Sequence, residues 1–415
     1  MQLPDHQLQR VLHLRDAVGV GLGAIIGAGI FVVTGVAADV AGPAFLVGLI
    51  IAGAVACFNG LSSAQLAAVY PQSGGTYEYG YQLLHPFMGF SAGWMFLLSK
   101  LSAAGIVAIG FGSYFHQLVP WLSPMIYSIG AIVLLTIANL MGIKKAGISN
   151  VIIVLITLVS LVYFIFGGLG SVNTKNFIPF APAGVLGIAE ASAILFFAFT
   201  GYARIATLAE EVVAPERTIP RAVVITIFTA IVLYAAVSFV TVGVTGAEAM
   251  AGSKSPVQQA AVTISPAMEL VITLGAATAM LGVLLSQILG ISRMMLAMAR
   301  RNDLPAFLKR IHPSTSVPHI GILVTSGVIV AITMLGTLDF VVRAAAFTIL
   351  LYYTITNLAA MRQPPVQHLY SRAVPWLGLM GCLAMSLTLP PIVIITGITL
   401  LAVGFAVRWM VKKWD

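Results

Sequence analysis

The chain has very little charge. Of its 415 residues, 8% are Asp, Glu, Lys or Arg and 59% are hydrophobic, and the mean hydropathy is +1.01. Water-soluble domains carry about 25% charged residues. The composition therefore excludes a soluble globular protein and predicts an all-α polytopic membrane protein.

Cysteine and clustered metal ligands are also scarce. The two cysteines, Cys57 and Cys382, both lie in apolar stretches and not in loops, so we expect no disulfide-linked partner subunit. The seven histidines are scattered, and no spacing typical of metal ligands is present. We expect neither a metal nor another cofactor.

Long apolar runs are the main feature of the sequence. Runs of about 20 apolar residues predict membrane-spanning helices. Pro390 and Pro391 mark the expected turn between the last two. The sequence predicts twelve spans, at residues 17–40, 43–69, 89–118, 122–141, 146–170, 184–211, 219–245, 266–300, 317–336, 339–361, 373–389 and 390–413.

The basic residues indicate the orientation of these spans. The net charge is +8, and most Lys and Arg residues fall in alternate loops and at the chain ends. Positive residues concentrate in cytoplasmic loops. We expect a multi-pass plasma-membrane protein with both termini cytoplasmic, residues 1–16 forming the N-terminal segment. The charge then serves topology and contact with anionic membrane lipids, and no nucleic acid partner is expected.

Two spans contain glycine at positions that predict a break in the helix. Gly27, Ala28 and Gly29 interrupt the first span, and Gly201 lies in the sixth, close to Arg204. Interrupted helices at corresponding positions of two halves are typical of secondary transporters built from inverted repeats. The expected repeats are residues 17–170 and 184–361, followed by a helical pair at 373–413. Simple helix packing by small residues is the alternative.

Breaks of this kind expose backbone groups that can bind a zwitterion. Free N–H groups at the start of a half-helix suit a carboxylate, and free carbonyls at the end of one suit an ammonium group. An amino acid therefore fits between two broken helices without a charged side chain in the site.

Four motifs carry a resemblance to a known family. Residues 23–31 (GAIIGAGIF) and 196–220 resemble the first-helix and sixth-helix motifs of the amino acid–polyamine–organocation permeases. Residues 71–77 (PQSGGTY) resemble the loop between their second and third helices. Residues 292–300 with Leu304 and Pro305 resemble the end of their eighth helix. The chain is most similar to bacterial relatives of cationic amino acid transporters.

The resemblance implies a fold of the LeuT type, with a 5+5 inverted repeat, two further helices and discontinuous first and sixth helices. It implies alternating access around a site in the middle of the membrane. By motif, Gly27, Ala28 and Gly29 would bind the substrate carboxylate. The carbonyls of Ile25, Phe197 and Thr200 would bind its amine. Phe197 would close over the substrate, with Phe199 as a second aromatic flank.

Two departures from the family concern charge. Many members carry a lysine in the fifth helix, whereas here Ile156 or Thr157 stands near that position. Lys100 and Arg204 lie inside spans instead, and an intramembrane charge suggests function. We hypothesise that one of them supplies the missing positive charge. A structural ion pair, such as Arg204 with Glu210, or snorkelling to the interface is the alternative.

A second charged group is expected at the cytoplasmic ends of the sixth to eighth helices. It contains Glu210, Glu211, Arg217, Arg221 and Arg293, which would form an inner gate of salt bridges or remain solvated helix ends. Residues 70–88 are expected to form a cytoplasmic re-entrant or interfacial element, with its aromatics as gate residues or interface anchors.

These features favour a secondary amino acid transporter without covalent catalysis, hence without catalytic residues. An intramembrane enzyme would need clustered nucleophiles, bases or metal ligands within the spans, and the sequence has none. The small Ala28 and Thr200 and the lack of a pocket acid favour neutral amino acids. Cationic amino acids or polyamines remain the alternative, as does a sensor of the same fold that does not transport. H+ and Na+ are both open as coupling ions.

Overall fold

The computed structural model describes all residues except 1–11, 71–73, 143–145, 208–210 and 415. The described residues are almost entirely helical and form no strand. The hydrocarbon of a bilayer requires such helical structure, because a helix satisfies its own backbone N–H and C=O groups. The fold class expected from the composition is confirmed.

The first predicted span is interrupted where the glycines are. Helix α1 (Leu14–Ile25) ends, the chain extends at Ile26, and a π-helix, η1 (Gly29–Val33), leads directly into α2 (Thr34–Ala41). The sixth predicted span is also irregular. Helix α8 (Gly184–Phe196) tightens into a 3₁₀-helix, η6 (Phe197–Tyr202), before α9 (Ala203–Thr207).

The remaining predicted spans each correspond to one helix. In chain order these are α3 (Phe45–Val69), α5 (Pro86–Leu118), α6 (Pro124–Leu140), α7 (Ala146–Gly168), α10 (Pro215–Thr245), α13 (Pro266–Arg300), α14 (His319–Leu335), α15 (Leu338–Arg362), α16 (Ala373–Thr388) and α17 (Pro391–Trp414). Short helices fill the loops, namely α4 (Thr76–Tyr79), the π-helix η3 (Gly80–Leu84), α11 (Ala247–Met250) and α12 (Pro256–Ile264).

Not all of these helices have the length of a full span. Among the described residues, eight stretches are long and apolar enough to cross a membrane, and the first of them, Leu14–Val69, includes both α1 and α3. Helices α6, α14 and α16 are apolar but shorter. The structure thus confirms a polytopic helical protein, and the count of twelve crossings stays a prediction.

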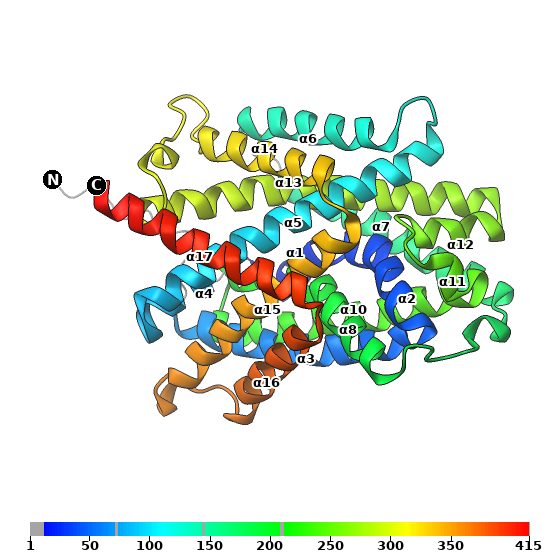
Figure 1. The fold of residues 1–415 in the computed structure, drawn as a ribbon, viewed down its shortest axis with the longest axis horizontal. Coiled ribbons are helices and arrows are strands. Elements are labelled where there is room, and N and C mark those ends of the chain that lie inside the picture. Colours follow the sequence, from blue (N-terminus) through cyan, green and yellow to red (C-terminus); the bar gives the residue numbers. More distant parts are fainter. Residues whose placement is uncertain (1–11, 71–73, 143–145, 208–210, 415) are drawn as a thin grey trace.

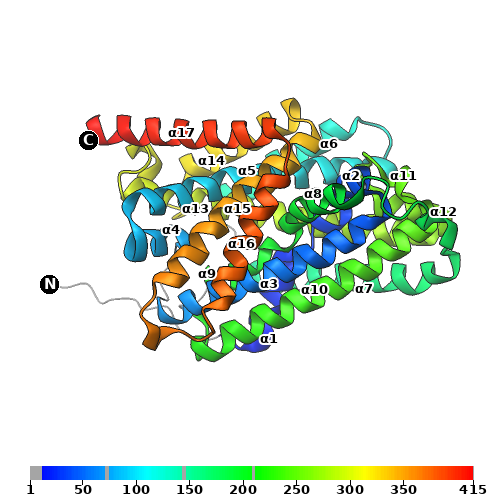
Figure 2. The ribbon, with the colours of Figure 1, turned by 60° about the horizontal axis from the view of Figure 1, so that its bottom comes forward.

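The helices differ in how deeply they are buried, and this identifies the centre of the molecule. The most apolar window of the α5 span is 78% buried, whereas that of the α17 span is 17% buried. Helix α5 runs through the middle of the bundle, between α13 and α15, and α6 lies beside α14 at one edge (Figure 1). Helix α17 lies along the outer surface (Figure 2). Its exposed apolar side chains are suited to lipid contact.

Polar side chains join three of the buried helices. The Asn357 side chain of α15 donates to Oδ1 of Asn59 in α3, and Asn59 Nδ2 contacts Cys382 Sγ of α16 at 3.2 Å. Nearby, Gln65 Nε2 donates to Gln363 Oε1 at 2.6 Å. Such bonds hold membrane helices together where the hydrophobic effect contributes little.

The substitution Asn357→Leu should loosen this junction, because the Asn59 amide oxygen loses its donor in a buried site. We expect a loss of about 0.6–1.7 kcal/mol in the free energy of unfolding, the range for interhelical hydrogen bonds in membranes. Denaturant unfolding of the purified protein in detergent micelles measures it. Thr396→Val, which removes a hydroxyl bond at the surface of α17, is the matched control. Equal stability of the two variants would show that the junction contributes nothing.

Candidate functional site

The interruption between α1 and η1 leaves backbone groups unpaired. Ile26 closes α1 by donating its N–H to Leu22 O at 2.8 Å, and its own φ and ψ of −76° and 106° are extended. Among the backbone hydrogen bonds that the described residues form outside regular helices, none is donated by the N–H groups of Gly27 and Ala28. The first N–H groups of a helix lack partners within that helix. This turn therefore presents donors that can bind an anion.

Two close backbone contacts join this interruption to η6. A Cβ on Gly29 would lie 2.6 Å from Ala198 Cβ, and a Cβ on Gly201 would lie 2.5 Å from the Ile25 nitrogen and overlap the Ala24 carbonyl. Neither position has room for a side chain. The two glycines thus let the irregular segments of the first and sixth spans lie directly against each other.

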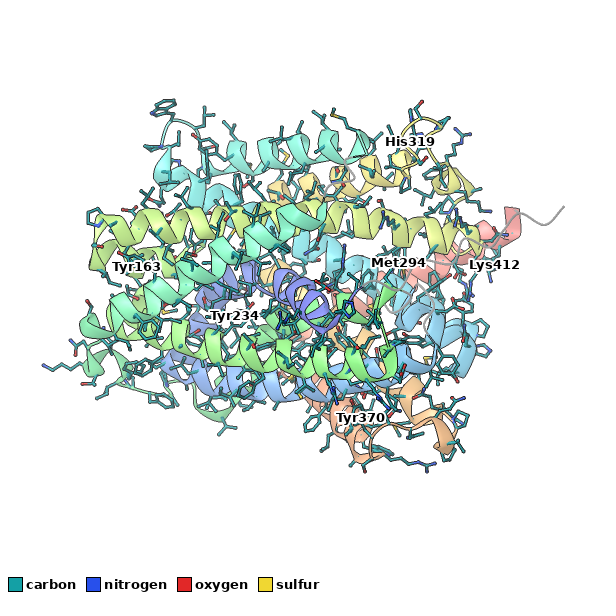
Figure 3. The ribbon with its side chains drawn as sticks, turned by 180° about the vertical axis from the view of Figure 1, so that it is seen from behind. Tyr163, Tyr234, Met294, His319, Tyr370 and Lys412 are labelled. Carbon is teal, nitrogen blue, oxygen red and sulfur yellow. The ribbon has the colours of Figure 1, made fainter. Side chains whose placement is uncertain are left out.

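Hydroxyl groups pair several of the carbonyls that the irregular segments release. Tyr234 of α10 donates to Ile25 O at 2.8 Å, and Tyr114 of α5 donates to Phe31 O at 2.7 Å. Tyr353 of α15 reaches Thr200 O at a longer 3.5 Å. Tyr234 lies near the middle of the molecule (Figure 3). Sequence reasoning missed these tyrosines, although a phenol in the middle of an apolar helix signals a buried hydrogen-bond partner.

The Phe197 carbonyl is paired locally. The Thr200 hydroxyl donates to it at 3.0 Å, within the same turn of η6. The three carbonyls expected to bind an amine, of Ile25, Phe197 and Thr200, therefore each have one hydroxyl partner already. A carbonyl oxygen has two lone pairs, so each can still accept a bond from a ligand.

A cavity of about 30 Å³ lies where these segments meet. This is about the volume of one water molecule in the liquid. It is lined by backbone and small or apolar side chains together with three polar residues, Lys100, Thr200 and Gln287. The other lining residues are Ala24, Ile25, Gly27, Ala28, Gly29, Ala103, Val107, Phe197, Ala198, Gly201 and Val283.

Comparison with known proteins identifies the family of this chain. A model of the amino acid permease family matches residues 16–415, which includes both irregular segments. The chain belongs to the amino acid permease family. The resemblance to the amino acid–polyamine–organocation superfamily is therefore confirmed.

Three relatives show the range of the permeases it resembles. An uncharacterized transporter of Mycobacterium tuberculosis is 38% identical over 97% of this chain and 91% of its own length. A branched-chain amino acid permease of Bacillus subtilis is 27% identical over 99% of this chain and 94% of its own. A vacuolar cationic amino acid transporter of Arabidopsis thaliana is 29% identical over 75% of this chain and 56% of its own.

The permease places most of the expected site residues around the cavity. Ile25, Gly27, Ala28, Gly29, Phe197 and Thr200 all line it, as does Lys100. Phe199 does not. Its fully buried ring packs against Tyr234 of α10, with the ring centroids 5.4 Å apart. Successive positions of a 3₁₀-helix point in different directions, so Phe197 and Phe199 do not face the same side.

Two of the expected intramembrane charges lie near each other. Lys100 lines the cavity, and Arg204, one turn beyond Gly201, lies close enough to act on it electrostatically. An Arg204 guanidinium nitrogen would be 3.5 Å from a Cβ on Gly290 of α13. Their role in coupling stays a prediction. In the fifth span, Thr157 donates its hydroxyl to Ile153 O at 2.8 Å and contacts Gly275 O of α13 at 3.4 Å.

The described part of the expected inner gate forms no salt bridges among its own residues. Glu210 lies outside the described residues, and no described ion pair involves Glu211, Arg217, Arg221 or Arg293. Glu211 instead contributes its backbone carbonyl, which accepts from the Leu12 N–H at 2.9 Å. Whether these residues gate transport stays a prediction.

Another charged cluster lies between α4, η3, α13 and α17. The Asp303 carboxylate is fully buried, and Arg408 of α17 donates to it at 2.8 Å. Tyr77 and Tyr81 donate to its second oxygen at 2.7 and 2.6 Å. Burial, together with the hydrogen bond to Asp303, raises the pKa of both phenols, so both remain protonated donors. Residues 76–84 are thus tied to α17 through one carboxylate.

A second ion pair strengthens the same cluster. Arg301 binds both carboxylate oxygens of Glu78, at 2.9 and 2.7 Å, and its guanidinium carbon lies 4.3 Å from the centre of the Tyr81 ring. Tyr77 and Tyr81 therefore pack within the protein, and whether they gate transport stays a prediction.

The substitution Gly201→Ala should abolish amino acid binding, because the new Cβ meets backbone atoms of Ala24 and Ile25, which cannot rotate away. Binding is measured by ligand-induced thermal shift and counterflow in proteoliposomes. Gly19→Ala is the matched control, since a Cβ there meets nothing within 4 Å, and alanine favours helix by about 1 kcal/mol. Unchanged binding in Gly201→Ala would contradict the close contact of the two segments.

The substitution Arg408→Leu should destabilise the folded state by about 3–5 kcal/mol, because it leaves the buried Asp303 carboxylate without its closest cation. The free energy of unfolding in detergent reports the loss. Lys413→Leu, an exposed change on the same helix, should cost about 1 kcal/mol or less. If the two variants unfold alike, the Asp303 cluster does not hold α17 in place.

Proposed function

We propose that this permease is a secondary transporter that carries neutral α-amino acids across the plasma membrane by alternating access. The observation that carries the proposal is the direct contact of two irregular helical segments around one cavity, with unpaired N–H groups on one and carbonyls on both. In this arrangement the substrate carboxylate binds Gly27, Ala28 and Gly29, and the ammonium group binds the carbonyls of Ile25, Phe197 and Thr200.

The lining of the cavity supports a neutral side chain. No Asp or Glu of the described residues lines it, and Ala28, Ala103 and Ala198 are small. A cationic substrate or a polyamine would need a carboxylate there, and it would face the Lys100 ammonium. The name of the branched-chain relative agrees with a neutral substrate. The cationic alternative is supported only by the names of relatives such as those of Arabidopsis thaliana.

The size of the cavity supports alternating access. A volume of about 30 Å³ cannot hold an amino acid, so the segments around it must separate to admit one. The repeats 17–170 and 184–361 are the proposed moving units, with residues 373–413 outside them. The distribution of Lys and Arg favours cytoplasmic termini, which would direct the Arg204 end of the cavity to the cytoplasm.

Counterflow in proteoliposomes tests the function. A thermal-shift screen with the twenty amino acids and with polyamines first identifies ligands of the purified protein. Vesicles loaded with an unlabelled neutral ligand, such as L-alanine or L-leucine, should then transiently accumulate the same radiolabelled amino acid from outside. Protein-free vesicles are the control. Repeating uptake with and without a Na+ gradient and a pH gradient identifies the coupling ion.

The outcomes separate the alternatives. Ligand binding without counterflow would identify a sensor that retains the fold but does not transport. Stabilisation by lysine, arginine or polyamines and not by neutral amino acids would establish the cationic alternative. The absence of any amino acid ligand would overturn the proposal.

A further inference from the structure

Lys100 lines the cavity from α5, whose apolar window has the highest buried fraction of the eight long apolar stretches among the described residues. Lys100, Ala103 and Val107 line the cavity together, and their spacing of three and four residues places them on one face of α5. The amine lies over the Phe96 ring of the same helix, 5.7 Å from the ring centre. Lys100 is half-buried.

No carboxylate of the described chain pairs with this amine. Four of the described acidic residues are paired elsewhere, Glu190 and Asp339 with Arg343, Asp303 with Arg408, and Glu78 with Arg301. A charge in an apolar interior is costly without a counter-ion. A ligand carboxylate in the cavity would supply such a counter-ion.

Contacts among the segments that line the cavity show that Lys100 lies at one end of it. Tyr114 of α5 bonds Phe31 of η1, which places the later residues of α5 beside η1 and Lys100 nearer the end of α1. Gly201 meets Ala24 at that same end, whereas Ala198 meets Gly29 at the other. Gly29 and Ala198 thus lie at the end of the cavity away from Lys100.

Gln287 adds a second polar group to the cavity. It lies one helical turn beyond Val283 on α13, towards Gly290 and therefore towards Arg204. Its Oε1 is buried without a hydrogen-bond partner among the described residues. A buried amide without a partner is uncommon. An unpaired amide oxygen needs a hydrogen-bond donor, so Gln287 suits a hydroxyl or amide N–H of a substrate side chain, whereas a carboxylate would bind the Lys100 ammonium group.

We propose that Lys100 determines the charge of the side chain that this permease accepts. It excludes cationic amino acids by repulsion, and it binds the side-chain carboxylate of aspartate or glutamate. The substrates are then neutral and acidic amino acids. This proposal rests on the function proposed above and specifies the part of the site that contacts the side chain.

Competition in the purified, reconstituted permease tests the proposal. Unlabelled L-aspartate, L-glutamate, L-lysine and L-arginine compete with radiolabelled L-alanine, or with whichever neutral ligand the screen identifies, for binding and counterflow. In the wild type, the acidic amino acids should compete and the basic ones should not. The quantity compared among variants is the inhibition constant of each amino acid relative to that of the neutral ligand.

The variants Lys100→Met, Lys100→Arg and Lys100→Glu separate charge from shape. Lys100→Met should reduce the relative affinity for aspartate and glutamate at least about tenfold, as expected for a lost charge-assisted hydrogen bond. Lys100→Arg should retain the acidic preference. Lys100→Glu should reverse it, so that lysine and arginine compete. Lys175→Met, an exposed change in the loop after α7, is the matched control and should keep the wild-type ratios.

Several results would overturn the inference while leaving the transport function intact. These are competition by lysine in the wild type, unchanged ratios in Lys100→Met, or an equal loss of every amino acid in that variant. The last would show that Lys100 binds the α-carboxylate and not the side chain. If Lys100→Met does not fold, the comparison of Lys100→Arg with Lys100→Glu still tests the effect of the charge. A wild type that binds no amino acid would overturn the transport function itself.

Discussion

The structure depends on how backbone groups are satisfied where two helices are interrupted inside an apolar protein. An unpaired N–H or C=O group in such surroundings costs several kcal/mol. The carbonyls released around η1 and η6 are paired by hydroxyls from three other helices, of which Tyr234 to Ile25 is the clearest example. The interruption therefore persists only because α5, α10 and α15 surround it. The donors that remain unpaired at Gly27 and Ala28 are then available to a ligand.

Charged side chains inside the protein are also paired with nearby groups. The buried Asp303 has Arg408 and two phenols around it, and Arg343 bridges Glu190 and Asp339. These pairs tie residues 76–84 to α17 and join α8 to the start of α15. Lys100 differs, since it lines the cavity and pairs with no described carboxylate. Under the proposed function, backbone groups bind the part that amino acids share, and Lys100 distinguishes their side chains.

Much of the fold and part of the site could be predicted from local sequence. The apolar runs predicted helix positions closely, as in α5 and α13, because burial in a bilayer dictates both composition and length. Gly27, Ala28, Gly29 and Thr200 could be assigned to the site because glycine marks a break directly. Tyr234 could not, since its partner Ile25 is 209 positions away in the chain. The sequence predicts both Phe197 and Phe199 as flanks of the substrate, and only the backbone path of η6 separates their directions.

By itself, the sequence determined that this protein is a helical membrane protein, where its helices lie and which two are interrupted, because hydrocarbon solvation and glycine act over a few residues. It also determined the family, through motifs that are local in the chain. The tertiary structure decided which groups meet. It placed Gly201 against Ala24, buried Asp303 beside α17, and directed Lys100 and Gln287 into one cavity. These are contacts between residues far apart in the chain, and their geometry follows from the packing of whole helices.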